Sequence, residues 1–247
     1  IRNLLFGIKK SRKYGRCAMV GYAPDQFGNI SQLPQILRGF GISSFVFGRG
    51  YAKLFLNEKG ELGRVPPPTE FRWIAPDGSC VTAFYLVQWY NNAQRISRDG
   101  KKAAEEIENI GKGLCGLTKL PYFLLMNGVD HLEPQSDVLT CLKNAGPFLE
   151  DGDEAIQAKM EDYVSDCLEY IGRNKIALPK ERGELRYGGD HDILRGCYSS
   201  RVKLKQRNAE LTARVEKTIE PLASMLEMCG FHGIYPADEL NYVWKLI

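Results

Sequence analysis

The sequence predicts an α/β fold in which a buried parallel sheet is followed by a helical segment. Strongly apolar runs, such as residues 17–22 and 42–49, alternate with helix-like stretches, which is typical of parallel strands covered on both faces. The 247 residues, 44% of them hydrophobic, are enough for a large core. From residue 199 onward, apolar residues at helical spacing indicate helices that pack in a bundle.

In the α/β part, the period of the apolar residues separates helices from strands. Helices are expected at residues 1–14, 30–41, 99–115, 134–145 and 154–173. Buried strands are expected at residues 17–22, 42–49 and 121–130. Two β-rich runs around a Pro-Asp-Gly turn predict a hairpin within residues 70–89. Residues 50–68, which are rich in Gly, Lys and Glu and end in three prolines, predict a long surface loop.

The helical part has its own pattern. Its apolar positions recur at spacings of three, four and seven, namely Leu204, Leu211, Val215, Ile219, Leu222 and Leu226. Pro221 should kink this helix or restart it, because proline cannot donate a backbone hydrogen bond. A further helix is expected to begin near Pro236. We therefore expect a boundary near residues 176–190, with an α/β catalytic part at 1–180 and a helical part at 181–247.

Composition narrows the classes of function and the cellular location. The 33 basic and 30 acidic residues give a formal charge of +3 without a basic stripe, which argues against a nucleic-acid partner. Seven cysteines without paired spacing indicate reduced thiols, so we expect a cytoplasmic protein. No apolar run reaches 18 residues, so no membrane-spanning helix is expected. The chain opens without methionine and stops inside a helix pattern, so we expect it to be a piece of a longer protein.

Two aspartates have the same setting. Asp25 follows the apolar run at 17–22, and Asp130 ends the run at 121–130. Ligands bind at the carboxyl edge of parallel strands, so both acids are expected at one rim. A carboxylate pair there suits acid/base or nucleophilic chemistry, including glycoside hydrolysis. Arg49 could orient a carboxylate at this rim, and Phe27 could offer a flat face to a sugar ring.

Structural interpretations of the same residues remain open. Asp25 lies in a Pro-Asp-x-x-Gly stretch, where aspartate is a common turn residue or helix cap. Asp130 could cap the helix that follows it. Arg49, between two glycines, could be solvated, and Phe27 could belong to the core. Spacing alone does not decide between these alternatives.

Four segments carry a resemblance to a known family. They are GYAPDQFGNISQLPQILRGFGI, FVFGRG, LLMNGVDH and LRGCYSSRVKLKQRNAELTARVEKTIEPLA, in this order. Together they resemble the α-mannosidases of glycoside hydrolase family 38, and the bacterial branch more than the secretory enzymes. The resemblance implies a (β/α)7-type barrel followed by a helical domain similar to a three-helix bundle. It also implies retaining hydrolysis of terminal α-linked mannose from a mannose-containing oligosaccharide or mannoside.

The resemblance assigns residues to roles. It implies that Asp25 is the catalytic nucleophile and also a zinc ligand, and that Asp130 is the general acid/base. Phe27 matches an aromatic residue that lines the sugar site, and Arg49 matches a basic residue near the nucleophile, so both are expected to bind the substrate. His131 is a further candidate for contact with the sugar. No histidine here, including His191 and His232, matches a zinc ligand of the family. The other zinc ligands are therefore expected outside this chain, which by itself should be inactive and free of metal.

Two other functions remain as alternatives. One is a related hydrolase with a different sugar specificity, because no residue pattern here is seen to read the axial 2-hydroxyl of mannose. The other is a carbohydrate-binding or scaffold module that keeps the fold without the chemistry, which the missing zinc ligands favour. The retention of both strand-end acids argues for an enzyme. The sequence also leaves open whether the protein forms a homo-oligomer.

Overall fold

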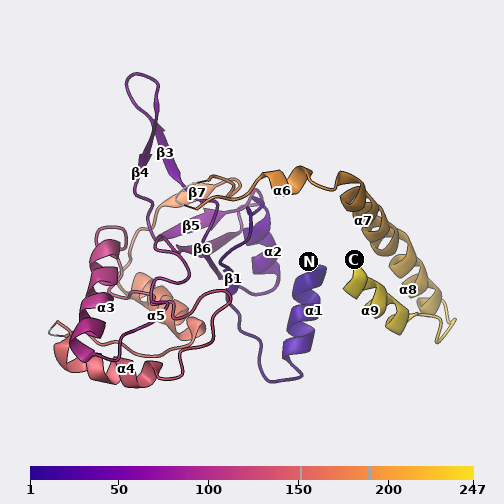
Figure 1. Cartoon of the computed structure of the whole chain (residues 1–247). Helices are drawn as coiled ribbons and strands as arrows, with labels where there is room; N and C mark the ends of the chain where they lie inside the picture. Colours follow the sequence, from indigo (N-terminus) through magenta and orange to yellow (C-terminus); the bar gives the residue numbers. More distant parts are fainter. Residues whose placement is uncertain (151, 189–190) are drawn as a thin grey trace. The chain divides into compact units, whose positions relative to one another are not determined.

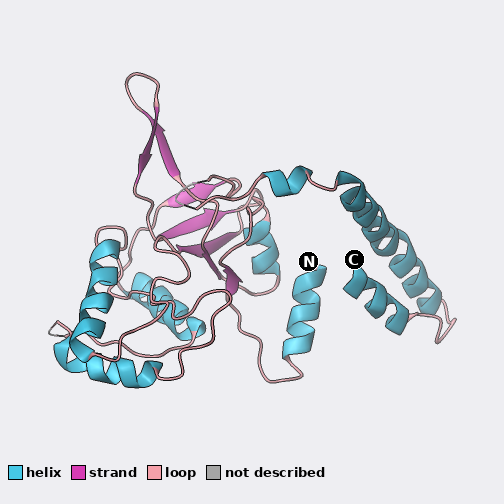
Figure 2. Cartoon of the chain, in the orientation of Figure 1, coloured by secondary structure: helices cyan, strands magenta, loops and turns pink. Residues whose placement is uncertain are grey.

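The computed structural model describes residues 1–150, 152–188 and 191–247 of the chain. The chain divides into two compact units, Ile1–Ile193 and Leu194–Ile247. The first unit contains a central sheet with helices around it, and the second contains helices (Figures 1 and 2). Among the described residues, none of the helices combines the length and the apolar character that crossing a membrane requires.

The sheet of the first unit has five strands in the order β1-β2-β6-β5-β7. Their bounds are Gly21–Ala23 for β1, Ser44–Phe47 for β2, Glu70–Ile74 for β5, Cys80–Tyr85 for β6 and Lys180–Arg182 for β7. The pairs β1/β2, β2/β6 and β5/β7 are parallel, whereas β5 and β6 form an antiparallel hairpin. A mixed α/β fold with a mostly parallel sheet is therefore confirmed. The closed seven-stranded barrel stays a prediction.

Both faces of the central strands β2 and β6 are buried, which explains the nearly continuous apolar runs in these strands. On one face, Phe45 and Phe47 stack at a centroid distance of 5.4 Å, and α2 (Leu33–Gly39) adds Leu37 to the same cluster. On the other face, Val46 and Phe84 pack with residues of α5 (Met160–Arg173). Alternate residues of β2 therefore serve two different cores.

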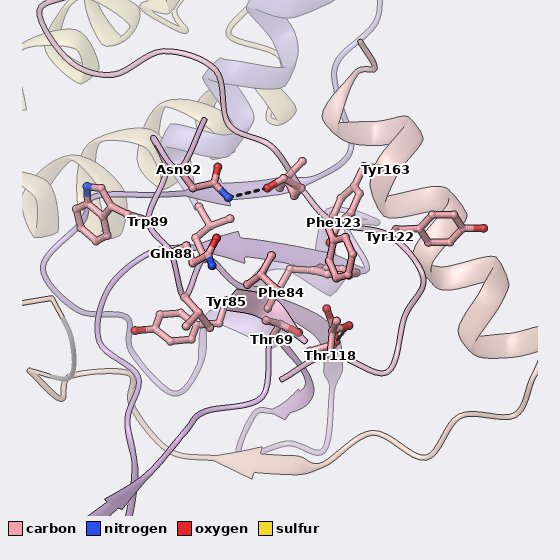
Figure 3. Close-up of a pocket in the computed structure, with 15 residues that line it drawn as sticks. Thr69, Phe84, Tyr85, Gln88, Trp89, Asn92, Thr118, Tyr122, Phe123 and Tyr163 are labelled. Carbon is pink, nitrogen blue, oxygen red and sulfur yellow. Dashed lines mark hydrogen bonds between the residues drawn. The ribbon is translucent and has the colours of Figure 1, made fainter. Parts of the chain in front are cut away.

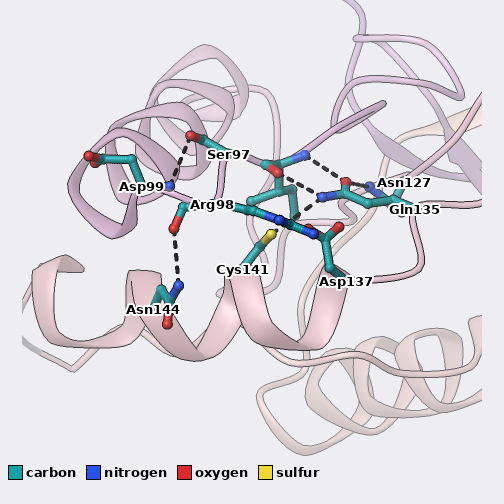
Figure 4. A network of polar contacts seen from close by, with 9 residues as sticks. Ser97, Arg98, Asp99, Asn127, Gln135, Asp137, Cys141 and Asn144 are labelled. Carbon is teal, nitrogen blue, oxygen red and sulfur yellow. Dashed lines mark hydrogen bonds and ion pairs between the residues drawn. The ribbon is translucent and has the colours of Figure 1, made fainter.

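The remaining helices of the first unit are α1 (Arg2–Ser11), α3 (Gly100–Leu114) and α4 (Val138–Ala145), followed by a short 3-10 turn at Gly146–Phe148. The Asp99 carboxylate caps α3 by accepting the Lys102 backbone N–H. Asn144 of α4 donates its side-chain amide to the Arg98 carbonyl at 3.0 Å, and Gln135 joins the same polar network (Figure 4). This network ties the start of α3 to α4.

Two predicted elements are wrong. Residues 121–130 form no strand, although they are apolar, and they run as a loop with Phe123 exposed. In the described structure no strand of the sheet pairs with this segment, and its hydrogen bonds go to side chains and to other loops. Residues 50–68 contain an antiparallel hairpin of β3 (Lys53–Leu56) and β4 (Leu62–Val65) instead of a loop without structure.

The second unit consists of α6 (Gly196–Ser199), α7 (Val202–Arg214), a π-helical turn at Val215–Ile219, α8 (Glu220–Met228) and α9 (Ala237–Leu246). The predicted interruption at Pro221 is confirmed, because the regular helical hydrogen bonding gives way to a π turn directly before α8. The helix expected near Pro236 begins at Ala237. The division at residue 180 and the bundle packing stay predictions; β7 still belongs to the sheet of the first unit.

Candidate active site

Asp25 and Arg49 meet at the carboxyl edge of the sheet. Asp25 follows β1 by two residues and Arg49 follows β2 by two residues, and these two strands are parallel neighbours. The Arg49 Nε and Nη2 atoms each lie 2.5 Å from the Asp25 Oδ1 atom. Gly48 allows this approach, because a Cβ atom there would lie 2.3 Å from the Pro24 carbonyl oxygen. The parallel pairing of β1 and β2 thus brings together two side chains that are 24 residues apart.

Further contacts fix the Arg49 guanidinium. It lies over the Trp89 ring at 4.6 Å and over the Phe27 ring at 5.4 Å, both within the range of cation–π attraction. Its Nη1 atom donates a hydrogen bond to the Asp192 carbonyl. A planar, forked cation can make these contacts at the same time, which a lysine ammonium cannot. Arg49 is therefore held by the residues that surround Asp25 rather than solvated.

Trp89 and Tyr90 belong to the same cluster, although their sequence pattern predicted no role for them. They follow β6, the third of three neighbouring parallel strands, so they reach the same edge as Asp25 and Arg49. Trp89 adopts a left-handed backbone with φ of 75°, which is rare for a bulky residue and often marks functional sites. Its ring lies 4.6 Å from the Tyr90 ring and 3.8 Å from the His191 ring.

Asp130 joins the cluster through Tyr90. The Tyr90 hydroxyl donates a hydrogen bond of 3.3 Å to the Asp130 Oδ2 atom. Burial raises the pKa of Tyr90, and the negative charges of Asp25 and Asp130 raise it further. Burial also raises the pKa of Tyr22 on β1, with a second contribution from the Asp130 charge. Tyr90 thus lies within electrostatic reach of both Asp25 and Asp130, which are far apart in the sequence.

Asp130 reaches this place without a strand. The Asn92 side chain donates to the Leu124 carbonyl at 3.0 Å (Figure 3). It also accepts the Met126 backbone N–H at 2.8 Å. The Ala93 backbone N–H donates to the Met126 carbonyl at 3.1 Å. In the first two of these bonds the Asn92 side-chain amide pairs with backbone groups of the loop, as the backbone of a neighbouring strand would. These hydrogen bonds therefore hold the loop that carries Asp130 next to the residues that follow β6.

A small cavity lies behind this edge of the sheet. Its volume is about 30 Å³, and its wall includes Trp89, Asn92, Gln88 and Glu70 (Figure 3). Such a volume holds about one water molecule and is far too small for a sugar ring. The aromatic and charged cluster around Asp25, Arg49 and Tyr90, and not this cavity, is the candidate site.

Two predicted site features remain, His131 and the metal site. His131 is exposed, and no contact within the described residues joins it to Asp25, Arg49 or Tyr90. In the described part of the chain, His, Cys, Asp and Glu side chains form no group of three or more that could hold a metal. The residues present therefore do not fit a zinc site by themselves. Asp25 is directed to Arg49 rather than to a second metal donor.

The cluster can orient one carboxylate with a cation and a second with a hydroxyl, beside aromatic rings of Phe27 and Trp89. An ionised carboxylate held by arginine is positioned to act as a nucleophile or as an electrostatic partner. A carboxyl group that contacts a tyrosine hydroxyl is positioned to exchange protons with a ligand. Trp89 and Tyr90 could have been found from the rule that identified Asp25, because they too follow an apolar strand.

Comparisons with known proteins point to one family. Residues 1–170 match the family model of the glycosyl hydrolases family 38 N-terminal domain. A Halalkalibacterium halodurans protein that carries the provisional name mannosylglycerate hydrolase is 32% identical over 255 residues, covering 100% of this chain and 27% of that protein. Alpha-mannosidase G of Dictyostelium discoideum is 25% identical over 249 residues, covering 100% of this chain and 20% of that protein.

A solved structure agrees with these matches. The crystal structure of an alpha-mannosidase from Enterococcus faecalis V583 superposes with a TM-score of 0.79 at 28% identity, covering 99% of this chain and 26% of that one. The chain spans 20% to 27% of the length of these three proteins. On the match over residues 1–170 and the similarity of the whole fold, the chain belongs to glycosyl hydrolase family 38.

Proposed function

We propose that the protein to which this chain belongs is a retaining glycoside hydrolase that releases terminal α-linked mannose from a mannose-containing oligosaccharide or mannoside. Family membership supports glycoside hydrolysis, and the names of the relatives support mannose as the sugar. The observation that carries the proposal is Tyr90, which lies within reach of both Asp25 and Asp130. A hydrolase of this kind needs two carboxyl groups beside one glycosidic bond.

The proposed reaction has two steps. In the first, Asp25 attacks the anomeric carbon while Asp130 gives its proton to the departing oxygen, so the glycosidic bond breaks and a bond from the sugar to Asp25 forms. In the second, water attacks the same carbon and gives a proton to Asp130, and the bond to Asp25 breaks. Two inversions retain the configuration, and they require the carboxyl groups to stand about 5–5.5 Å apart.

Arg49 and Tyr90 act as positioning residues in this proposal. Both Arg49 donors bind the Oδ1 atom of Asp25, so the Oδ2 atom is the one presented for attack. The Tyr90 hydroxyl can donate to Asp130 after that group has given up its proton. Orientation of this kind is worth much in catalysis, because a misplacement of 1 Å can cost about 100-fold in rate.

The other assignments rest on the resemblance and on nearby contacts. We assign the Phe27 ring, which lies beside Arg49, to the sugar site, and His131 to a contact with the sugar. Zinc stays a proposal in which Asp25 is one ligand and the others come from outside this chain. A cytoplasmic location is supported by the seven cysteines, all of which are free thiols.

The test uses the full-length protein and an aryl α-mannoside. Replacing Asp25 or Asp130 with Ala should lower kcat by at least about 1000-fold, and the anomeric proton in NMR should show that the first product is the α-anomer. Asp166→Asn, which removes an exposed carboxylate on α5, is the matched control and should keep full activity. Full turnover by either alanine variant, or a β-anomer as first product, would refute the proposal.

A mannosylated small acid is a second candidate substrate. It is favoured by the relative at 32% identity, whose provisional name is mannosylglycerate hydrolase. Comparing kcat/KM for mannosylglycerate and for an α-linked mannose disaccharide decides between the two. A panel of aryl glycosides separates both from a hydrolase of another sugar, and turnover of none of them would favour a binding module.

A further inference from the structure

Gln88 carries a buried oxygen atom beside the small cavity at the edge of the sheet. Gln88 and Trp89 line this cavity (Figure 3), and Glu70 lines it as well. The Oε1 atom of Gln88 is buried, and within the described residues no donor reaches it. An unsatisfied buried acceptor costs about 1–3 kcal/mol, so native proteins rarely leave one without a hydrogen bond. This atom therefore indicates a donor that the protein itself does not supply.

The other end of the Gln88 amide is already fixed. Its Nε2 atom donates a hydrogen bond of 3.1 Å to the Ile110 carbonyl of α3. Gly113 makes room for this contact, because a Cβ atom there would lie 2.2 Å from Nε2. Turning the amide over would give up the bond to α3, since only the nitrogen end can donate. The donor that Oε1 needs is therefore expected inside the cavity.

The other polar side chains examined in the cavity wall are occupied, except for Glu70. Asn92 uses both ends of its amide on the neighbouring loop. The Thr118 hydroxyl accepts the Leu120 backbone N–H at 2.9 Å and donates to the Glu70 carboxyl group at 2.9 Å. A carboxyl group has about four acceptor positions on its two oxygens. The buried carboxyl group of Glu70 thus has room for a further donor.

Two acceptors on one cavity fit a ligand that donates twice. The cavity volume of about 30 Å³ has room for about one water molecule, and water donates two hydrogen bonds. A metal ion does not fit, because the described His, Cys, Asp and Glu side chains form no group of three or more that could hold one. Burial also raises the pKa of Glu70, which favours the uncharged carboxyl group that needs no cation.

This cavity lies directly beside the backbone that carries Trp89. Trp89 follows Gln88, has a φ of 75° and holds its ring 4.6 Å from the Arg49 guanidinium. Its backbone N–H donates to the Leu86 carbonyl at 2.9 Å, which closes a tight turn. A left-handed backbone costs about 1–3 kcal/mol and persists where the surrounding contacts enforce it. Gln88, tied to α3 at one end of its amide, is placed to supply such a contact at the other.

We propose that the cavity binds one water molecule that joins Gln88 to Glu70, and that Gln88 is a positioning residue for the active site. The water donates one hydrogen bond to the Oε1 atom of Gln88 and one to the carboxyl group of Glu70. This link keeps the turn at residues 86–89 in place, and the turn holds the Trp89 ring against Arg49. The positioning role rests on the proposed function, whereas the water site does not.

A crystal structure of the full-length protein, at a resolution that shows ordered water, tests the site directly. We expect one density peak within hydrogen-bond distance of both the Gln88 Oε1 atom and a Glu70 carboxyl oxygen. The peak should be absent from crystals of Glu70→Leu, which lacks the second acceptor. No peak in the wild type, or a peak with the five or six oxygen neighbours of a cation, would overturn the water site whatever the activity.

Kinetics on an aryl α-mannoside test the positioning role. Gln88→Leu and Glu70→Leu should each lower kcat by about tenfold with little change in KM, because small misplacements at an active site are costly. The double variant should also lose about tenfold rather than about 100-fold, since both changes remove the same water. Glu70→Gln keeps a polar partner for the water and should restore most of the rate. Gln157→Leu, the same replacement at an exposed loop residue, is the control.

Melting curves of each variant allow kcat to be referred to folded protein. Additive losses in the double variant, or full kcat in both leucine variants, would overturn the positioning role. If a leucine variant does not fold, the rate of Glu70→Gln decides instead, and a loss as large as tenfold there would count against the link. A wild type without turnover would refute the proposed function and the positioning role together, while the electron density alone decides the water site.

Discussion

Arg49→Lys isolates the part of the site that depends on the shape of arginine. Lysine keeps the positive charge but has one nitrogen, whereas Arg49 uses Nε and Nη2 on Asp25 and Nη1 on the Asp192 carbonyl. Lysine also loses the flat stacking on Trp89. Lysine has its three N–H donors on one nitrogen, which cannot fill the separate positions of Nε, Nη2 and Nη1, so we expect one of the three hydrogen bonds to be kept. The orientation of Asp25 is then no longer fixed.

The expected loss follows from this count. Hydrogen bonds to charged groups contribute about 1.5–3 kcal/mol each when buried, and the Asp25 side chain is 38% exposed, so about 1 kcal/mol for each lost bond is reasonable. Two lost bonds give about 2 kcal/mol, which corresponds to a fall of about 30-fold in kcat/KM. We expect most of it in kcat, because the fork orients the nucleophile.

The assay is kcat/KM of the full-length protein on an aryl α-mannoside, with a melting curve for each variant. Arg38→Lys, on the exposed side of α2, is the matched control and should keep both activity and melting temperature. An Arg49→Lys variant that retains wild-type kcat/KM would show that the fork does not position Asp25. A loss of activity that only follows a loss of folded protein would show the same.

Two further predictions concern stability. Glu70 is buried, and burial raises its pKa despite hydrogen bonds that include one from Thr118 at 2.9 Å. The stability that neutral Glu70 contributes is fully present below the unfolded pKa and is lost as pH rises through the folded pKa. The difference in melting temperature between Glu70→Gln and wild type should therefore be more in favour of the variant at pH 7 than at pH 4. An equal difference at both pH values would contradict this. Gly48→Ala should destabilise by about 2 kcal/mol or more in urea unfolding, because its Cβ would meet the Pro24 carbonyl, whereas Gly39→Ala, where a Cβ meets nothing within 4 Å, should not.

Local patterns predicted most helices and the hairpin of β5 and β6. The runs that became β2 and β6 are mostly apolar, with Ser44 and Thr82 as exceptions, and in the structure they are buried on both faces, as such runs require. The helix expected at residues 99–115 begins after Asp99, and the interruption at Pro221 follows from the missing N–H of proline. These features depend on neighbours in the chain, so they can be read from the sequence.

The segment at 121–130 shows where such patterns fail. It is as apolar as a strand, but a strand also needs a partner backbone, and in the structure no strand of the sheet pairs with it. The side chain of Asn92 takes that role instead. The hairpin at 50–68 was missed for the opposite reason, since its strands pair only with each other and show no buried face.

By itself, the sequence determined that Asp25 and Arg49 follow buried strands, and that parallel strands carry such residues to one edge. It could not say which strands are neighbours, and the order β1-β2-β6 is what sets Asp25 beside Arg49 and adds Trp89 and Tyr90. The link from Tyr90 to Asp130 was likewise decided by tertiary structure alone. The physical reason is that strand order and loop contacts depend on the packing of residues far apart in the chain, whereas helix caps, turns and buried runs depend on residues next to one another.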